Sequence, residues 1–190
     1  MTTILGVDPG LTRLGVGVIK HGPGRSVSLV HVDVYRTPAH DETASRIGAL
    51  AAQLAHVLDE FSPDVVALER VFAQHNVRTV MGTAQISGVV FALAHERSIP
   101  VSLRTPSEVK AAVTGHGRAS KSQVGTLVQA ILGLEEIPKP ADAADALALA
   151  ITEAWRGVSP GTKTEATSLT PAQQAWREAE AKAKQPRLTE

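Results

Sequence analysis

The first third of the chain shows the alternation of apolar and polar residues that is typical of β-strands. Residues 4–8 form a short apolar run, residues 14–20 alternate with glycine, and residues 27–35 alternate apolar and polar side chains. Pro9-Gly10 and the cluster Gly22-Pro23-Gly24 supply turn residues between these runs. The pattern therefore predicts three consecutive strands with short connections, arranged as an antiparallel meander.

A helical repeat replaces this pattern after residue 40. We expect Asp41 to cap a helix that continues to about Phe61, because apolar residues recur along one face of it. These residues are Ile47, Leu50, Leu54, Val57 and Leu58. Pro63 ends this helix, and the run DVVALE over residues 64–69 predicts a buried parallel strand. A second helix is predicted from about Gln74 to Arg97, and a short fifth strand over residues 100–103.

Two capping boxes mark the beginning of later helices. Residues 105–108 (TPSE) combine a capping threonine, a proline at the first helical position and a glutamate three residues after the cap. Residues 120–123 (SKSQ) repeat this arrangement and open a helix to about Leu132, where Gly133 is a stop signal. A last helix is predicted over residues 141–156.

The order of these elements predicts an α/β fold of the RNase H-like type, a five-stranded mixed sheet flanked by helices. We assign this domain to residues 1–157. Residues 158–190 are rich in Thr, Ala, Pro, Gln and charged residues, with few large apolar groups, so we expect a polar, disordered C-terminal tail.

Composition narrows the possible chemistry. The chain has no cysteine, which excludes disulfides, thiolate metal sites and cysteine nucleophiles. There is no signal-peptide pattern, and the longest uncharged run, residues 79–94, falls short of the ~20 apolar residues of a membrane span. We therefore expect a cytoplasmic protein with no membrane partner.

The zero net charge does not exclude nucleic acid, because phosphate binding depends on where positive charge lies. Five basic residues between positions 97 and 121 are opposed only by Glu108. They are Arg97, Arg104, Lys110, Arg118 and Lys121.

Four acidic residues stand where acids are unusual. Asp8 ends the first apolar strand and Glu69 ends the fourth, while Asp142 and Asp145 lie three residues apart in a helix rich in Ala and Leu. If the first and fourth strands are parallel neighbours, both strand-end acids emerge at the carboxyl edge of the sheet. The last helix can bring its two acids to the same place.

Clustered carboxylates repel one another, and a raised pKa or bound divalent cations relieve the repulsion. Oxygen ligands without cysteine or a histidine pair favour Mg²⁺ or Mn²⁺, and four carboxylates suit two ions ~4 Å apart, the arrangement for phosphodiester hydrolysis. Each acid also has a simpler interpretation. Asp8-Pro9-Gly10 is a turn sequence, Glu69 could end its strand at solvent, and Asp142 and Asp145 could complement a helix dipole.

Three segments together resemble the RuvC family of crossover-junction endodeoxyribonucleases. They are ILGVDPGLTRLGVGVI near the N-terminus, LERVFAQHN after the fourth strand and PADAADALALAI in the last helix. The resemblance covers residues 2–156. It implies that Asp8, Glu69, Asp142 and Asp145 are the catalytic and metal-binding residues, carrying two Mg²⁺ ions per subunit, with Mn²⁺ as a substitute.

The resemblance also implies a function. Family members resolve four-way (Holliday) DNA junctions by paired symmetric nicks that leave 5′-phosphate and 3′-hydroxyl ends, in recombination and DNA repair. They act as homodimers and work with the RuvA–RuvB branch-migration complex. The helix over residues 74–97 has two apolar or small faces, so one is available for a second subunit, although a helix enclosed within one domain would look similar.

DNA-binding roles follow from the same resemblance. Phe72 matches an aromatic residue that stacks on an unpaired base near the junction centre, although a core phenylalanine is an alternative. Lys110 and Lys121 match positions that bind phosphates, although surface lysines are commonly just solvated. Arg118 is a further DNA-binding candidate, and Arg70, Arg78 and His116 are weaker ones.

Two other classes remain open at this point. The segment DPGLTRLG also resembles the opening of actin-like ATPases and sugar kinases, but these need two related domains and a second phosphate loop, for which 190 residues are too few. A YqgF-like nuclease or a nucleic-acid-binding module that does not cut would share the fold.

Overall fold

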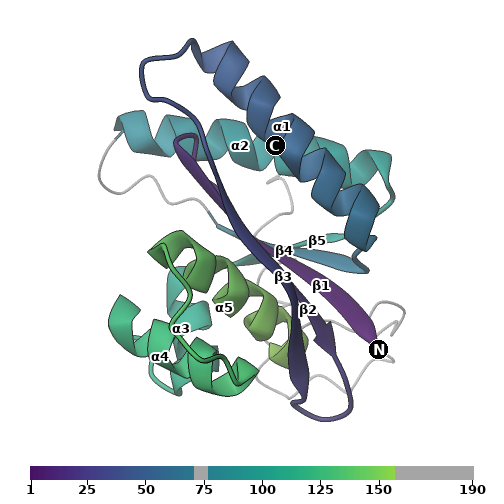
Figure 1. The fold of residues 1–190 in the computed structure, drawn as a ribbon, viewed down its shortest axis with the longest axis vertical. Coiled ribbons are helices and arrows are strands. Elements are labelled where there is room, and N and C mark those ends of the chain that lie inside the picture. Colours follow the sequence, from purple (N-terminus) through teal and green to yellow (C-terminus); the bar gives the residue numbers. More distant parts are fainter. Residues whose placement is uncertain (71–76, 157–190) are drawn as a thin grey trace, which may run out of the picture. The chain divides into compact units, whose positions relative to one another are not determined.

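The computed structural model describes residues 1–70 and 77–156, and these form a sheet with helices on both faces (Figure 1). The strands are β1 (Thr2–Asp8), β2 (Arg13–His21), β3 (Val27–Arg36), β4 (Val65–Glu69) and β5 (Val101–Arg104). Their order in the sheet is β3-β2-β1-β4-β5. β1 is antiparallel to β2 and parallel to β4, and β4 is parallel to β5. This confirms the predicted five-stranded mixed sheet and its opening meander.

The helices also lie close to their predicted positions. They are α1 (Thr43–Phe61), α2 (Val77–Glu96), α3 (Pro106–Thr114), α4 (Lys121–Leu132) and α5 (Ala141–Arg156). One detail is wrong: Glu42, not Asp41, is the residue at the cap position of α1, and its side chain makes no capping hydrogen bond. None of the helices within the described ranges is long and apolar enough to cross a membrane.

Two hydrophobic cores hold the layers together, one on each face of the sheet. α1 and α2 cover one face, and α3, α4 and α5 cover the other (Figure 1). In the first core, Leu54 and Ile86 of the helices pack against strand residues such as Val16. In the second core, Leu147 and Ile151 of α5 are fully buried. This burial stabilises the domain and fixes α5 against the sheet.

Glycines make the contact between α5 and the sheet unusually close. A Cβ on Gly6 of β1 would lie 2.0 Å from the backbone oxygen of Ala146, and one on Gly15 of β2 would lie 2.3 Å from that of Asp142. Neither distance is possible for a real side chain, so only glycine allows α5 to lie this close. The helix that carries two of the acids therefore rests directly on the backbone of the strands that lead into and out of the Asp8 turn.

Both predicted capping boxes are present and fix where α3 and α4 begin. The Thr105 hydroxyl accepts from the Glu108 amide at 3.2 Å, while the Glu108 carboxylate accepts from the Thr105 amide at 2.7 Å. Ser120 and Gln123 exchange the same pair of bonds at the start of α4. The caps satisfy backbone donors that a helix start otherwise leaves unpaired.

Candidate active site

Asp8 and Glu69 lie side by side because of the strand register. β1 and β4 are paired in parallel from Ile4 opposite Val65 to Val7 opposite Leu68. Continuing this register by one residue sets Asp8 beside Glu69, at the carboxyl ends of both strands. The two carboxyl groups lie close enough for the charge of Glu69 to raise the pKa of Asp8. The expected meeting of the two strand-end acids is therefore present.

The two acids of α5 lie at the same end of the sheet, but each is paired with a cation. Asp145 accepts a hydrogen bond of 2.6 Å from the Lys121 ammonium group. Asp142 forms an ion pair of 3.1 Å with Arg13, which begins β2. Nothing in the sequence pattern indicated these two pairs, because each joins residues from separate elements.

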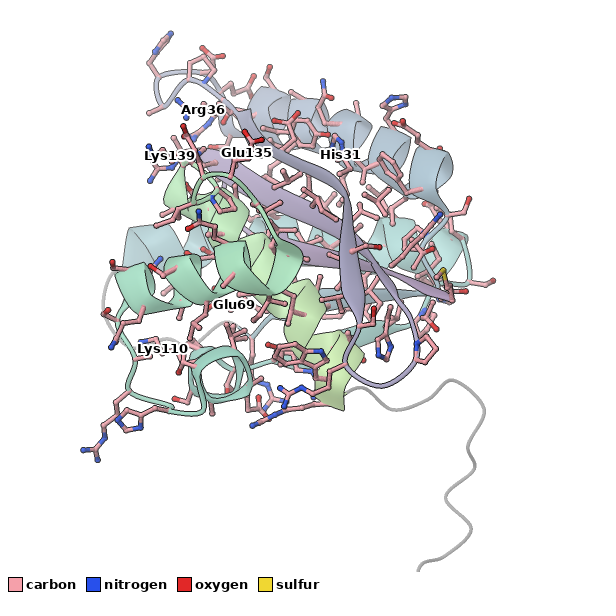
Figure 2. The ribbon with its side chains drawn as sticks, turned by 60° about the horizontal axis from the view of Figure 1, so that its bottom comes forward. His31, Arg36, Glu69, Lys110, Glu135 and Lys139 are labelled. Atoms are coloured by element: carbon pink, nitrogen blue, oxygen red, sulfur yellow. The ribbon has the colours of Figure 1, made fainter. Side chains whose placement is uncertain are left out.

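Asp8, Glu69 and Asp145 line one small hollow, with a volume of 90 Å³. Lys110 and Lys121 line it as well, and Figure 2 shows Lys110 and Glu69 on the same side of the molecule. Asp142 lines a neighbouring and larger hollow of 980 Å³, together with the turn over residues 10–13. The structure therefore brings three of the predicted acids and both predicted lysines into one place, with the fourth acid beside it.

Burial and the mutual repulsion of the carboxylates determine the electrostatics of this hollow. The pKa of Asp8 is raised to about 8, chiefly by burial and then by the charges of Glu69, Asp145 and Asp142, while the charge of Lys121 opposes the shift. Burial also raises the pKa of Glu69, followed by the charge of Asp145. Among the described residues, the ion pairs engage Asp142 and Asp145 but leave Asp8 and Glu69 without a paired cation, so the site favours an additional cation or a proton.

The donor set fits a hard divalent ion. As the side chains stand, no three acidic or histidine residues of the described chain are grouped closely enough to hold a metal ion. In this arrangement Arg13 and Lys121 engage Asp142 and Asp145. The ligands on offer are nonetheless carboxylate oxygens alone, which Mg²⁺ and Mn²⁺ prefer.

A buried arginine holds the turn that follows Asp8. Arg46 of α1 is only 9% exposed, and its guanidinium donates to the hydroxyl of Thr37 at 3.0 Å and to that of Thr12 at 2.8 Å. The Thr37 hydroxyl in turn donates to the backbone oxygen of Leu11. Sequence reasoning missed this residue, whose only signal was a charge among the apolar positions of a helix.

The remaining predicted residues are placed less centrally or lie outside the description. Phe72 is among residues 71–76, which fall outside the described residues, as does the predicted tail over residues 158–190. Arg118 and His116 are exposed in the connection between α3 and α4, and Arg70 is exposed just after β4. Arg118 does not line either hollow that contains the acids. The side chain of Arg78 also falls outside the described part.

Comparison with known proteins decides the family. Residues 4–153 match the profile of the family described as crossover junction endodeoxyribonuclease RuvC. The chain belongs to the RuvC family. It is 58% identical over 163 residues to a RuvC of Saccharopolyspora erythraea, covering 86% of this chain and 82% of that protein. A RuvC of Parafrankia sp. is 60% identical over 154 residues, covering 81% and 86%.

A solved structure of RuvC agrees with this assignment. The structure of T. thermophilus RuvC in complex with a Holliday junction substrate has a TM-score of 0.78 to this chain at 36% identity, covering 82% of this chain and 94% of that one. RuvC membership makes this chain a crossover junction endodeoxyribonuclease with an RNase H-like fold that depends on divalent metal ions. The interpretation as an ATPase or sugar kinase is therefore wrong.

Proposed function

We propose that this RuvC protein resolves four-way DNA junctions by paired symmetric nicks during recombination and repair, leaving 5′-phosphate and 3′-hydroxyl ends. The observation that carries the proposal is the hollow in which Asp8, Glu69 and Asp145 meet Lys110 and Lys121. Carboxylates there provide metal ligands, and lysines beside them provide partners for the phosphates of a DNA strand.

Asp8, Glu69, Asp142 and Asp145 are the residues that would hold two Mg²⁺ ions, with Mn²⁺ able to replace them. When bound, the ions lower the pKa of the attacking water and neutralise the charge that develops on the leaving 3′ oxygen. The strands fix Asp8 and Glu69, and the close seating of α5 fixes the other two acids. Lys121 and Arg13 are then free to turn from their carboxylates to DNA phosphates.

DNA contacts beyond the acids follow the family pattern. Lys110 and Lys121 bind phosphates beside the cleaved bond, and Arg118 binds phosphate from the connection between α3 and α4. Phe72 stacks on an unpaired base at the junction centre, an interaction worth ~1–3 kcal/mol. Replacing Phe72 by alanine should therefore leave metal binding intact but reduce junction cleavage.

A homodimer would present two such sites to the two like strands of a junction. The outer face of α2 supports this, because Met81 is 55% exposed and Phe91 is 42% exposed, beside the small exposed residues Ala84 and Gly88. Large apolar side chains left open on one helix face are typical of an interface. We assign the nuclease domain to residues 1–157, place its action in the cytoplasm, and expect it to act with RuvA and RuvB.

The decisive experiment compares cleavage of a labelled mobile four-way junction and a matching linear duplex, with Mg²⁺ or with EDTA. Wild-type protein is compared with Glu69→Gln and with Glu60→Gln, a control that neutralises an exposed acid of α1. We expect symmetric, Mg²⁺-dependent nicks in the junction only, lost in Glu69→Gln and retained in Glu60→Gln.

Other outcomes would separate the competing functions. Junction binding without cleavage by the wild-type protein would identify a binding module. Equal cleavage of both substrates would leave a nuclease on this fold but remove the resolvase function. Full activity of Glu69→Gln would remove the carboxylate site.

A further inference from the structure

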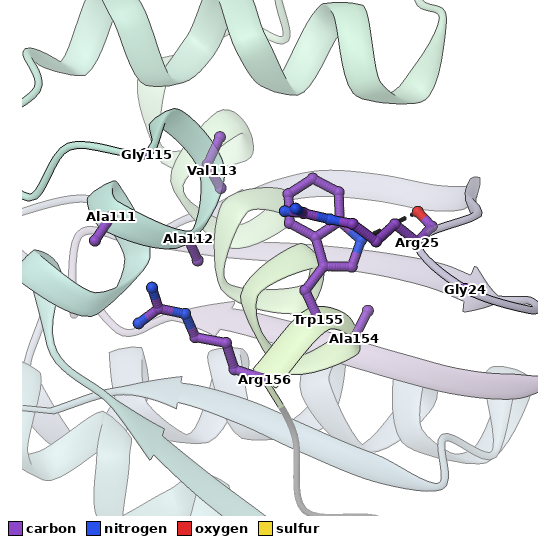
Figure 3. Close-up of a pocket in the computed structure, with 9 residues that line it drawn as sticks. All are labelled: Gly24, Arg25, Ala111, Ala112, Val113, Gly115, Ala154, Trp155 and Arg156. Atoms are coloured by element: carbon purple, nitrogen blue, oxygen red, sulfur yellow. Dashed lines mark hydrogen bonds between the residues drawn. The ribbon is translucent and has the colours of Figure 1, made fainter.

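A second hollow lies at the opposite end of α5 from the acids (Figure 3). Its volume is 510 Å³, and its walls come from the β2–β3 turn, the second half of α3 and the last turn of α5. Arg25, Trp155 and Arg156 supply its large side chains, whereas the α3 wall includes the small residues Ala111 and Ala112. Two arginines and an aromatic ring thus surround an open, shallow space.

The position of the Arg25 guanidinium is set by an aromatic ring and not by an acid. It lies 3.8 Å from the centre of the Trp155 ring, in a cation–π contact. The indole N–H of Trp155 donates separately to the Arg25 backbone oxygen at 3.1 Å. The backbone bond already fastens the turn to α5, so the guanidinium is not needed for that purpose. A guanidinium stacked flat on a ring keeps donors at its edge for a phosphate.

Neither arginine is neutralised within the described part of the chain. The ion pairs there include neither Arg25 nor Arg156. The one acid in the last turns of α5, Glu153, is buried and receives two hydrogen bonds from Arg104 at 2.6 and 2.9 Å. Figure 3 shows Arg156 extending away from the indole toward Ala111 and Ala112. The hollow therefore carries two exposed positive charges without a counter-charge.

α3 joins this hollow to the candidate active site. Val109 and Lys110 line the hollow of the acids, and the next residues, Ala111 to Val113, line the second one. Thirteen positions of α5 separate Asp142 from Trp155, which corresponds to roughly 20 Å at about 1.5 Å per residue. A duplex spans that distance in about six base pairs, at about 3.4 Å per phosphate on one strand.

We propose that Arg25 and Arg156 bind phosphates of a duplex arm of the junction, about six base pairs from the cleavage site. The chemical partner is the DNA backbone, so this contact carries no sequence preference. The inference rests on the proposed junction-resolving function and extends its DNA surface from the active site along α3 to the end of α5. The contact contributes to binding and register of the arm and takes no part in bond breakage.

The test measures equilibrium binding in EDTA, where no cleavage occurs, to a four-way junction with long arms at several salt concentrations. We compare wild type, the single variant Arg156→Gln and the double variant Arg25→Gln/Arg156→Gln. The control is Lys20→Gln, since strand alternation places this exposed lysine of β2 on the opposite face of the sheet. A second junction carries neutral methylphosphonates five to eight nucleotides from the cleavage site.

The slope of log affinity against log salt should become less steep by about 0.9 for each lost contact, and by about 1.8 in the double variant. Methylphosphonates should weaken binding of the wild type and of Lys20→Gln but leave the double variant unchanged. The midpoint of thermal unfolding should stay at the wild-type value for Arg156→Gln, because the cation–π contact with Trp155 is made by Arg25.

Three results would overturn the proposal. The first is a wild-type slope of log affinity against log salt in both arginine variants. The second is an equal loss of affinity for the methylphosphonate junction in all proteins. The third is a loss of affinity in Lys20→Gln as large as that of the double variant. A different result would count against the resolvase function itself, namely wild-type protein that binds the junction no better than a linear duplex.

Discussion

Replacing Gly15 by alanine should disable the site by moving α5. A Cβ at this position would lie 2.3 Å from the backbone oxygen and 2.9 Å from the backbone carbon of Asp142. Ordinary contacts begin at 3.4 Å, so α5 or β2 would have to move by about 1 Å. Gly15 is paired with Asp8 in the sheet, and the movement would therefore separate Asp8 from the acids of α5.

Two consequences follow from a movement of this size. Overpacking against a rigid backbone should lower the free energy of unfolding by about 1–3 kcal/mol. A misplacement of ~1 Å at a catalytic group can reduce the rate about 10²-fold, which is more than the loss of stability would cause while the protein stays folded. Single-turnover cleavage of a four-way junction with Mg²⁺, well below the unfolding midpoint, measures the second effect separately from the first.

Gly48→Ala is the matched control. Gly48 is an exposed position of α1, and a Cβ there would meet nothing within 4 Å. Alanine should therefore stabilise this helix by up to ~1 kcal/mol and leave cleavage unchanged. Wild-type cleavage and an unchanged unfolding midpoint in Gly15→Ala would refute the idea that the close seating of α5 sets the geometry of the acids.

Three further predictions concern buried charge. Between pH 3.8 and about 8 the metal-free folded protein holds a proton at Asp8 that the unfolded chain releases, so its stability falls as pH rises. Asp8→Asn should remove this penalty and raise the free energy of unfolding at pH 7 by no more than about 4 kcal/mol, while abolishing cleavage. Thermal unfolding in EDTA at several pH values measures the stability change. A variant less stable than wild type at pH 7 would contradict the prediction. Arg46→Met should cost about 2–4 kcal/mol in denaturant unfolding and impair cleavage more than DNA binding, because two hydroxyl partners and the turn after Asp8 lose their support. Glu153→Gln should cost up to about 3 kcal/mol, because it leaves the partly buried Arg104 without its counter-charge. Arg104→Met should restore part of that loss in a double-mutant cycle.

The fold could be predicted from sequence largely because its signals are local. Strand alternation, the turn residues and the capping boxes of α3 and α4 each depend on a few consecutive residues, and they set the element order. The prediction that Asp41 caps α1 was wrong. Aspartate is a common capping residue, but the cap position of α1 is occupied by Glu42, whose side chain makes no capping hydrogen bond. Propensity alone cannot distinguish neighbouring polar residues at a helix start.

The candidate site was predictable only in part, for a related reason. Asp8 and Glu69 could be placed together because parallel strands end at one edge of the sheet. The pairing of Asp142 with Arg13 could not, since it depends on side-chain rotamers of separate elements. Gly6 and Gly15 looked like ordinary strand glycines, because nothing local reveals that a helix backbone from more than about 120 residues later will lie against them.

The long separation in sequence between β1 and α5 also affects when the candidate site forms during protein synthesis. Gly6 of β1 lies against Ala146 of α5, so nearly the whole domain must be synthesised before α5 can pack on β1. Contacts of such high sequence separation form late and slowly compared with local ones. Until α5 has been synthesised and docked, the nascent chain holds Asp8 and Glu69 but not the acids of α5. We therefore expect chains that end before α5 to lack nuclease activity, because they carry only two of the four candidate carboxylates.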